Sequence, residues 1–148
     1  MISFFPDLNV WLALSVSAHI HSPEAWNWLN LVPRQAKLIF CRYTHIGFLR
    51  LLTNEAAMGE QTLTLQNAWR VYDTWISDPR VEFHPEPRGL DARFREATTP
   101  FAAKRASKWV GDCYLLAHAR ESGATLVTFD KALNDLARKS DYPVIVPL

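Results

Sequence analysis

Short apolar runs alternate with longer segments of helical periodicity along the chain. Runs of the length of a buried strand occur at residues 2–5, 37–41, 81–84, 124–128 and 143–146. The segments between them have helical character, over residues 23–31, 44–52, 63–76, 91–97, 112–122 and 131–138. Strands that alternate with helices in this way predict the α/β class, with a parallel sheet covered by helices on both faces.

Residues at the ends of these segments support the predicted helices. Ser22 and Pro23 stand where an N-cap and a first helical residue are expected. Thr44 is the expected cap of the helix over residues 44–52. Gly123 follows the helix over residues 112–122 and is expected to end it in the left-handed conformation.

The apolar run at residues 8–18 is the nearest thing to a targeting signal. No basic residue precedes it, and Pro6 and Asp7 stand directly before it. Its eleven residues are far fewer than the roughly 20 that a membrane-spanning helix needs. We therefore expect a first strand that continues into a first helix, and no membrane partner.

Composition narrows the class of protein further. With 148 residues, of which 49% are hydrophobic and 21% charged, we expect a single globular domain over residues 1–148. The formal net charge of +1 excludes proteins that capture nucleic acid or an anionic membrane by overall charge alone. Cys41 and Cys113 lie far apart without CxxC spacing, which disfavours a disulfide scaffold and favours a reducing, cytoplasmic location.

Polar residues with metal-binding chemistry follow the ends of predicted strands. Asp7 follows the first strand, with Asn9 two residues later, and Asp130 follows the strand that ends at Thr128. Asp112 opens a predicted helix. Because ligands of open parallel sheets bind beyond the carboxyl ends of the strands, these side chains are expected in one cleft. Three carboxylates there would suit a hard divalent cation such as Mg²⁺.

Each aspartate also has a simpler interpretation. Asp7, Asp112 and Asp130 all stand at predicted helix starts, where aspartate is a favoured N-cap. Three caps need not converge, whereas the ligands of one metal ion must. Both interpretations stay open at this point.

Four segments resemble the PIN-domain ribonucleases of the VapC toxin type. Residues 6–14 (PDLNVWLAL) are similar to the opening of these proteins, and residues 44–54 (THIGFLRLLTN) to their central helix. The segments 112–117 (DCYLLA) and 123–130 (GATLVTFD) resemble their acidic C-terminal half. The matches occur in the family's order over the whole chain.

This resemblance implies a PIN-like, three-layer α/β/α fold with a central parallel sheet. It implies a metal-dependent endoribonuclease that acts as the toxin of a toxin–antitoxin pair and cleaves RNA with a metal-activated water. Asp7, Asp112 and Asp130 would then bind Mg²⁺ or Mn²⁺, with Asn9 and Thr128 as supporting residues. It also implies a homodimer that binds a cognate antitoxin, and the six tryptophans would suit such interfaces unless they form a Trp-rich core.

One position departs from the family's pattern. PIN domains commonly carry a glutamate on the helix after the second strand, and the matching residue here is taken to be His45. An imidazole in the cleft would favour Mn²⁺ over Mg²⁺. Alternatively, His45 shares an apolar face with Phe48, Leu49 and Leu52 and takes no part in the chemistry.

Basic residues gather in the second half of the chain. Residues 88–108 hold six basic and two acidic residues, interleaved with Phe94 and Phe101, whereas residues 1–74 hold five of each sign. Basic residues interleaved with aromatic rings are typical of surfaces that bind single-stranded nucleic acid, although a solvated loop has the same composition. The candidate RNA-binding residues are Arg50, Arg93, Arg95, Lys104, Arg105 and Lys108.

Two other functions remain open from the sequence. A doubly wound phosphatase would use Asp7 as a nucleophile that becomes phosphorylated. A binding module that kept the fold but lost activity would explain why His45 stands where a glutamate is expected.

Overall fold

The computed structural model describes residues 2–148, and its centre is a five-stranded, wholly parallel sheet. The strands are β1 (Ser3–Pro6), β2 (Lys37–Phe40), β3 (Val81–Phe83), β4 (Thr125–Val127) and β5 (Val144–Ile145). Their order across the sheet is β3-β2-β1-β4-β5, and Phe4 of β1 pairs with Leu38 of β2 on one side and Thr125 of β4 on the other. All five strands predicted from the apolar runs are present, and the α/β prediction is confirmed.

Eight α-helices connect the strands in the described part of the chain. They are α1 (Leu8–Ser15), α2 (Ser22–Leu31), α3 (Arg42–Leu52), α4 (Glu55–Met58), α5 (Leu65–Ile76), α6 (Leu90–Thr98), α7 (Val110–Ser122) and α8 (Lys131–Lys139). Three 3₁₀ turns are also present, η1 (Gly59–Gln61), η2 (Thr99–Phe101) and η3 (Ser107–Trp109). Within residues 2–148, no helix is both long and apolar enough to cross a membrane.

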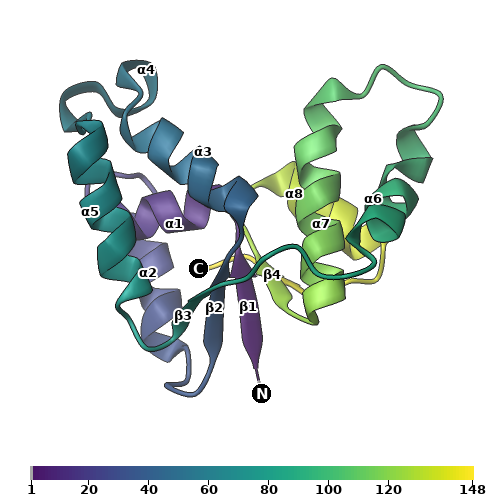
Figure 1. Ribbon diagram of the computed structural model, residues 1–148, viewed down its shortest axis with the longest axis horizontal. Helices are drawn as coiled ribbons and strands as arrows, with labels where there is room; N and C mark the ends of the chain where they lie inside the picture. The colour runs from purple at the N-terminus through teal and green to yellow at the C-terminus, as the bar shows by residue number, and fades with distance from the viewer. Residues whose placement is uncertain (1) are drawn as a thin grey trace.

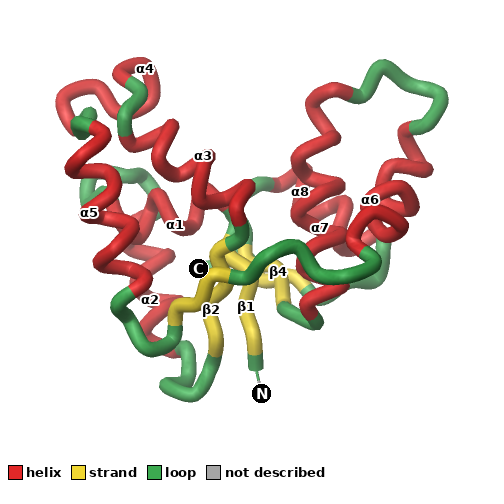
Figure 2. The backbone as a smooth tube through the Cα atoms, viewed as in Figure 1, coloured by secondary structure: helices red, strands yellow, loops and turns green. Residues whose placement is uncertain are grey.

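The helices divide into two layers because neighbouring strand residues point to opposite faces of the sheet. Phe4 and Leu38 belong to the core shared with α1, α2, α3 and α5. Phe5 and Ile39, their neighbours in sequence, belong to the core shared with α7 and α8, against which Phe94 of α6 also packs. Figure 1 shows these two groups of helices diverging from the sheet, and Figure 2 shows the strands gathered where the groups meet. The arrangement is the three-layer α/β/α fold expected.

Tryptophans contribute to the core and to the surface. Trp11 is fully buried and stacks on Phe40 with ring centroids 3.9 Å apart, and Trp28 packs edge-on against Phe4 at 5.6 Å. Trp26 and Trp69, in contrast, are 42% and 43% exposed. The Trp-rich core and the aromatic surface, posed as alternatives by the sequence, are therefore both present.

The start of α3 differs from the prediction. The helix begins at Arg42, two residues early, with Cys41 as its N-cap and Thr44 at the third helical position. The Thr44 hydroxyl accepts a 3.1 Å hydrogen bond from the backbone N–H of Cys41, so Thr44 closes the capping box from inside the helix. Gly123 ends α7 with φ of 63°, as predicted.

The sheet's chain reversal fixes where a ligand can bind. From β1 the chain continues through α1 and α2 to β2, whereas β4 lies on the other side of β1. The carboxyl ends of β1 and β4 are therefore neighbours at a topological switch point, the usual binding position of open parallel sheets. Asp7 and Thr128 are the residues that directly follow these two strands.

Candidate functional site

Asp7 is fixed by groups from β4 and α1. The backbone N–H of Leu8 donates to its Oδ1 at 2.6 Å, so Asp7 caps α1, and the Thr128 hydroxyl donates to its Oδ2 at 2.9 Å. Only 7% of Asp7 is exposed, and burial raises the pKa of its carboxyl although both hydrogen bonds act to lower it. The Asp7 carboxyl group thus both caps α1 and lies at the switch point, so the two interpretations of Asp7 do not exclude each other.

Asp130 is held at the adjacent strand end through the same threonine. Its backbone N–H donates to the Thr128 hydroxyl oxygen at 2.9 Å. Its Oδ1 accepts hydrogen bonds from the N–H groups of Ala132 (2.8 Å) and Leu133 (3.3 Å), and so caps α8. Thr128 is fully buried and joins the two aspartates by donating to one and accepting from the other. The structure therefore brings Asp7, Thr128 and Asp130 together.

Asp112 completes the acidic group from α7. It lies in the first turn of α7, whose N-cap is Trp109, so Asp112 is not a cap. Its carboxylate accepts no hydrogen bond from any residue in 2–148. Burial, and then the negative charges of Asp130 and Asp7, raise the pKa of Asp112 to about 6. The charge of Asp112 therefore lacks a compensating partner.

The donor set suits a divalent cation in chemistry and charge. Asp112 and Asp130 line one pocket of about 280 Å³ together with Lys108, Trp109 and Ala132. Carboxylate oxygens are the ligands that Mg²⁺ and Mn²⁺ prefer, and a cation would offset the burial and the repulsion that raise the pKa of Asp112. No three His, Cys, Asp or Glu side chains within residues 2–148 are already close enough to surround one ion. Binding therefore requires a side-chain movement, for which the unbonded Asp112 carboxylate is available.

Tyr43 borders this acidic group and was not anticipated from the sequence. It lies in the first turn of α3, is 48% exposed, and its hydroxyl lies against Gly111, where any side chain would collide with it. Burial, followed by the charges of Asp112 and Asp7, raises the pKa of the Tyr43 phenol. The sequence did not indicate this placement, because the predicted helix began at residue 44 and left Tyr43 outside it.

His45 lies on a different face of α3 from the one that meets the acidic group. It is 3% exposed and stacks on Tyr72 of α5 with centroids 3.8 Å apart, while Arg42 Nη1 donates to its Nδ1 at 2.9 Å. Burial, and then the positive charge of Arg42, lower the pKa of its imidazole. Two residues along a helix turn the side chain by about 200°. His45 is thus not placed with the carboxylates as the family pattern suggested, and the apolar-face alternative describes its surroundings.

Asn9 and Arg50 occupy less enclosed positions. Asn9 is exposed in the first turn of α1, two residues after Asp7. Arg50 is exposed on α3 and pairs with no carboxylate among residues 2–148. Its side chain is therefore available to an external anion.

The predicted basic stretch separates into paired and unpaired cations. Arg93 binds Glu121 at 2.6 Å and Glu96 at 3.3 Å, and Arg95 binds Asp91 at 2.8 Å. These two arginines are internally neutralised. Lys104, Arg105 and Lys108 are exposed and form no ion pair within residues 2–148. Lys108 also lines the pocket of Asp112 and Asp130.

Comparison with known proteins agrees with this fold. The family model for the PIN domain matches residues 4–139. Ribonuclease VapC41 from Mycobacterium tuberculosis is 39% identical over 132 residues, which cover 85% of this chain and 88% of that protein. Ribonuclease VapC39 from the same species is 26% identical over 140 residues, with 88% of this chain and 91% of that protein covered.

Solved structures share the fold at low sequence identity. VapBC2 from Rickettsia felis, bound to a DNA fragment from its promoter, has a TM-score of 0.74 at 14% identity and covers 99% of this chain and 100% of that one. VapC20 from Mycobacterium tuberculosis, a toxin that cleaves the sarcin–ricin loop, has a TM-score of 0.66 at 16% identity and covers 89% and 93%. The match of the family model to residues 4–139 and the 39% identity to VapC41 agree with the sheet order and the acidic switch point, so the chain belongs to the PIN-domain family and is a VapC-type member of it.

Proposed function

We propose that this chain is a divalent-metal-dependent endoribonuclease that acts as the toxin of a toxin–antitoxin pair. The observation that carries the proposal is the convergence of Asp7, Asp112 and Asp130, from three segments, with the pKa of Asp112 raised to about 6 by burial and by the other two charges. The relatives named ribonucleases support the choice of RNA as substrate.

Several residues of the chain have separate roles in the proposed cleavage. A bound Mg²⁺ or Mn²⁺ supplies an acidified water and offsets negative charge on the attacked phosphate. Asp7, Asp112 and Asp130 would hold the ion, and Thr128 keeps Asp7 in one orientation through the 2.9 Å hydrogen bond. Lys108, at the edge of the same pocket, would attract the RNA phosphate, and the Tyr43 hydroxyl is a second donor beside Asp112.

A protein partner and a second copy would cover the exposed apolar side chains. The VapBC complexes among the structural neighbours support an antitoxin as the partner. Trp26 on α2 and Trp69 on α5 are each about two-fifths exposed, and Leu65 and Ile76 on α5 are exposed as well. A surface of this kind suits association between copies of the chain, which we propose to be a homodimer.

A weakened binding module is the second candidate, because the α3 face nearest the acidic group carries Tyr43, Gly47 and Arg50 rather than a carboxylate. The function is tested by incubating the purified chain with an end-labelled single-stranded RNA in Mg²⁺, Mn²⁺ or EDTA. The nuclease proposal expects cleavage with either ion, none in EDTA, and a loss of at least about a hundredfold in Asp112→Asn.

Asp135→Asn is the matched control, since Asp135 is exposed on α8 and forms no ion pair within residues 2–148. We expect this variant to cleave as the wild type does. RNA binding without cleavage in any of the ions would instead identify the binding module.

A further inference from the structure

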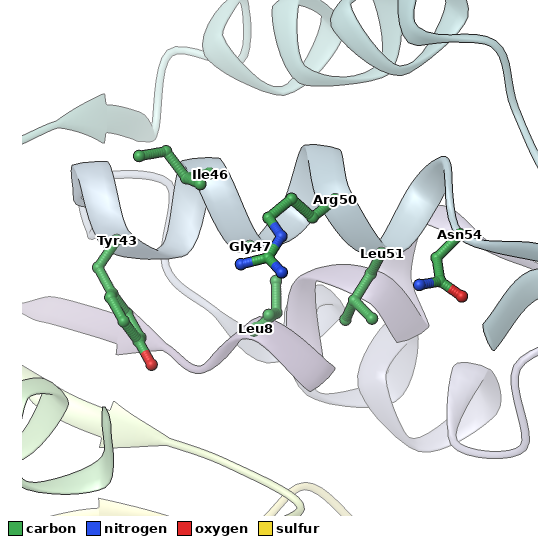
Figure 3. A pocket seen from close by; sticks show the side chains of 7 residues that line it. All are labelled: Leu8, Tyr43, Ile46, Gly47, Arg50, Leu51 and Asn54. Carbon is green, nitrogen blue, oxygen red and sulfur yellow. The ribbon is translucent and has the colours of Figure 1, made fainter. Parts of the chain in front are cut away.

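A second pocket lies beside the acidic group, along α3. It has a volume of about 330 Å³ and extends from Tyr43 to Asn54, with Leu8 on its inner side. Figure 3 shows the Arg50 side chain extending back along the helix toward Tyr43, and Arg50, Gly47 and Leu8 all line the pocket. Because Leu8 directly follows Asp7, the pocket adjoins the proposed cleavage site.

The close approach of α3 to the first turn of α1 depends on Gly47. A Cβ atom at this position would lie 2.7 Å from Leu8 Cδ2, too close for an undisturbed contact. The missing side chain lets the helix pack closely on Leu8.

The side-chain polar groups that line the pocket are donors. Arg50 carries a positive charge without a carboxylate partner in residues 2–148. Asn54 uses its Oδ1 to accept the N–H of Ala57 at 3.0 Å as the cap of α4, so its amide NH₂ remains to donate. The Tyr43 hydroxyl, the third polar group, is a protonated phenol at neutral pH and can donate as well. The lining contains no carboxylate.

We propose that this pocket binds one nucleotide of the RNA next to the cleaved bond, and that it sets a preference for the base at that position. The proposal rests on the nuclease function above. Arg50 binds the phosphate of this nucleotide, and the Asn54 amide donates to an acceptor on the base edge. The Tyr43 ring and the apolar side chains of Ile46 and Leu51 contact the base and the ribose.

The charge of the lining distinguishes RNA from a basic segment of a protein partner. Phosphate oxygens and base carbonyls are acceptors, which match a lining of donors and a single cation. A basic side chain from a protein partner would meet the positive charge of Arg50 without a carboxylate in the pocket to offset it. The lining therefore favours an anionic occupant, which on the nuclease function proposed above is RNA.

The test measures RNA binding by fluorescence anisotropy in EDTA, so that cleavage does not interfere. Arg50→Ala should weaken the binding of a labelled single-stranded RNA roughly tenfold, and should lower the slope of log affinity against log salt by about 0.7, the value of one phosphate contact. Arg34→Ala is the matched control. Arg34 precedes β2, at the amino end of the strand and away from the carboxyl ends where the acidic group lies, and it forms no ion pair within residues 2–148. It should leave both quantities unchanged.

Asn54→Ser tests the base contact separately. Serine keeps an oxygen that can cap α4 and adds no charge, but it removes the NH₂ donor. The variant should retain the wild-type melting temperature and salt slope, and should reduce the difference in affinity among homopolymeric RNAs at least about threefold.

Several outcomes would overturn the proposal. An Arg50→Ala protein with wild-type affinity and salt slope contradicts the phosphate contact, and equal losses in Arg50→Ala and Arg34→Ala indicate only diffuse attraction. An unchanged base preference in Asn54→Ser contradicts base recognition. If the wild-type chain still cleaves RNA in these cases, the pocket assignment alone fails. If the wild type neither binds nor cleaves RNA, the nuclease proposal fails with it.

Discussion

The hydroxyl of Thr128 donates a 2.9 Å hydrogen bond to Oδ2 of Asp7, across 121 positions of sequence. The same oxygen accepts the backbone N–H of Asp130. One buried threonine therefore couples the carboxyl ends of β1 and β4 and links the Asp7 carboxylate to the backbone of Asp130.

Replacing Thr128 should separate the effect of its hydroxyl group on stability and metal binding from the effect of its side-chain volume. Thr128→Val keeps the volume but leaves the buried Asp7 carboxylate without its donor. We expect a loss of about 1–3 kcal/mol in the free energy of unfolding and weaker Mn²⁺ binding. Urea titration and calorimetry on Thr128→Val and on the control Thr128→Ser, which keeps the hydroxyl, would measure both effects. Equal stability and metal affinity in the two variants would show that this hydrogen bond contributes to neither.

The raised pKa of Asp112 predicts a pH-dependent stability of the metal-free protein. Because its folded pKa of about 6 exceeds the ordinary value of 3.8, the stabilisation from its neutral form is complete below about pH 4 and is lost as the pH rises through 6. Asp112→Asn should remove this loss and raise the stability at pH 7.5 by about 1 kcal/mol, after allowance for screening by solvent. Melting curves between pH 4 and 8 in EDTA test this. A variant less stable than the wild type at pH 7.5 would refute the electrostatic cause.

Two glutamate substitutions on α3 distinguish its faces. His45→Glu puts a carboxyl against Tyr72 in a position that is 3% exposed, so it should cost about 2–4 kcal/mol of stability without strengthening metal binding. Tyr43→Glu adds a carboxylate beside Asp112 and should strengthen Mn²⁺ binding. Calorimetric titration of Mn²⁺ into both variants measures this difference. Stronger Mn²⁺ binding by His45→Glu would show that the side chain at position 45 reaches the cleft.

The basic residues should fall into two classes when RNA binding is measured. Reversing the charges of Lys104, Arg105 and Lys108 should lower the salt slope by up to about 2, because each can contact a phosphate. Reversing Arg93 and Arg95 breaks their pairs with Glu121 and Asp91, and should lower the melting temperature with little effect on the slope. Equal slopes for both sets would mean that the internal ion pairs do not decide which residues contact RNA.

The fold could be predicted from the sequence because strand length and helical periodicity are local signals. Asp7 and Asp130 could be placed for a related reason, since residues that follow adjacent parallel strands meet at one edge of the sheet. The position of His45 stayed open, because the family pattern put it in the cleft whereas the apolar periodicity put it beside Phe48 and Leu52. Its packing on Tyr72 of α5, a contact between separate helices, decides between the two. The neutralisation of Arg93 by Glu121 depends on a contact between residues 28 apart on separate helices, which no local pattern encodes.

The central claim is that Asp7, Asp112 and Asp130 form one cation site. Isothermal titration of Mn²⁺ into the metal-free wild type and Asp112→Asn, at pH 7.5, tests it most directly. The account predicts saturable binding by the wild type and a loss of at least about tenfold in affinity in Asp112→Asn, with Asp135→Asn unchanged. No binding to the wild type at millimolar Mn²⁺, or equal binding by wild type and Asp112→Asn, would contradict it.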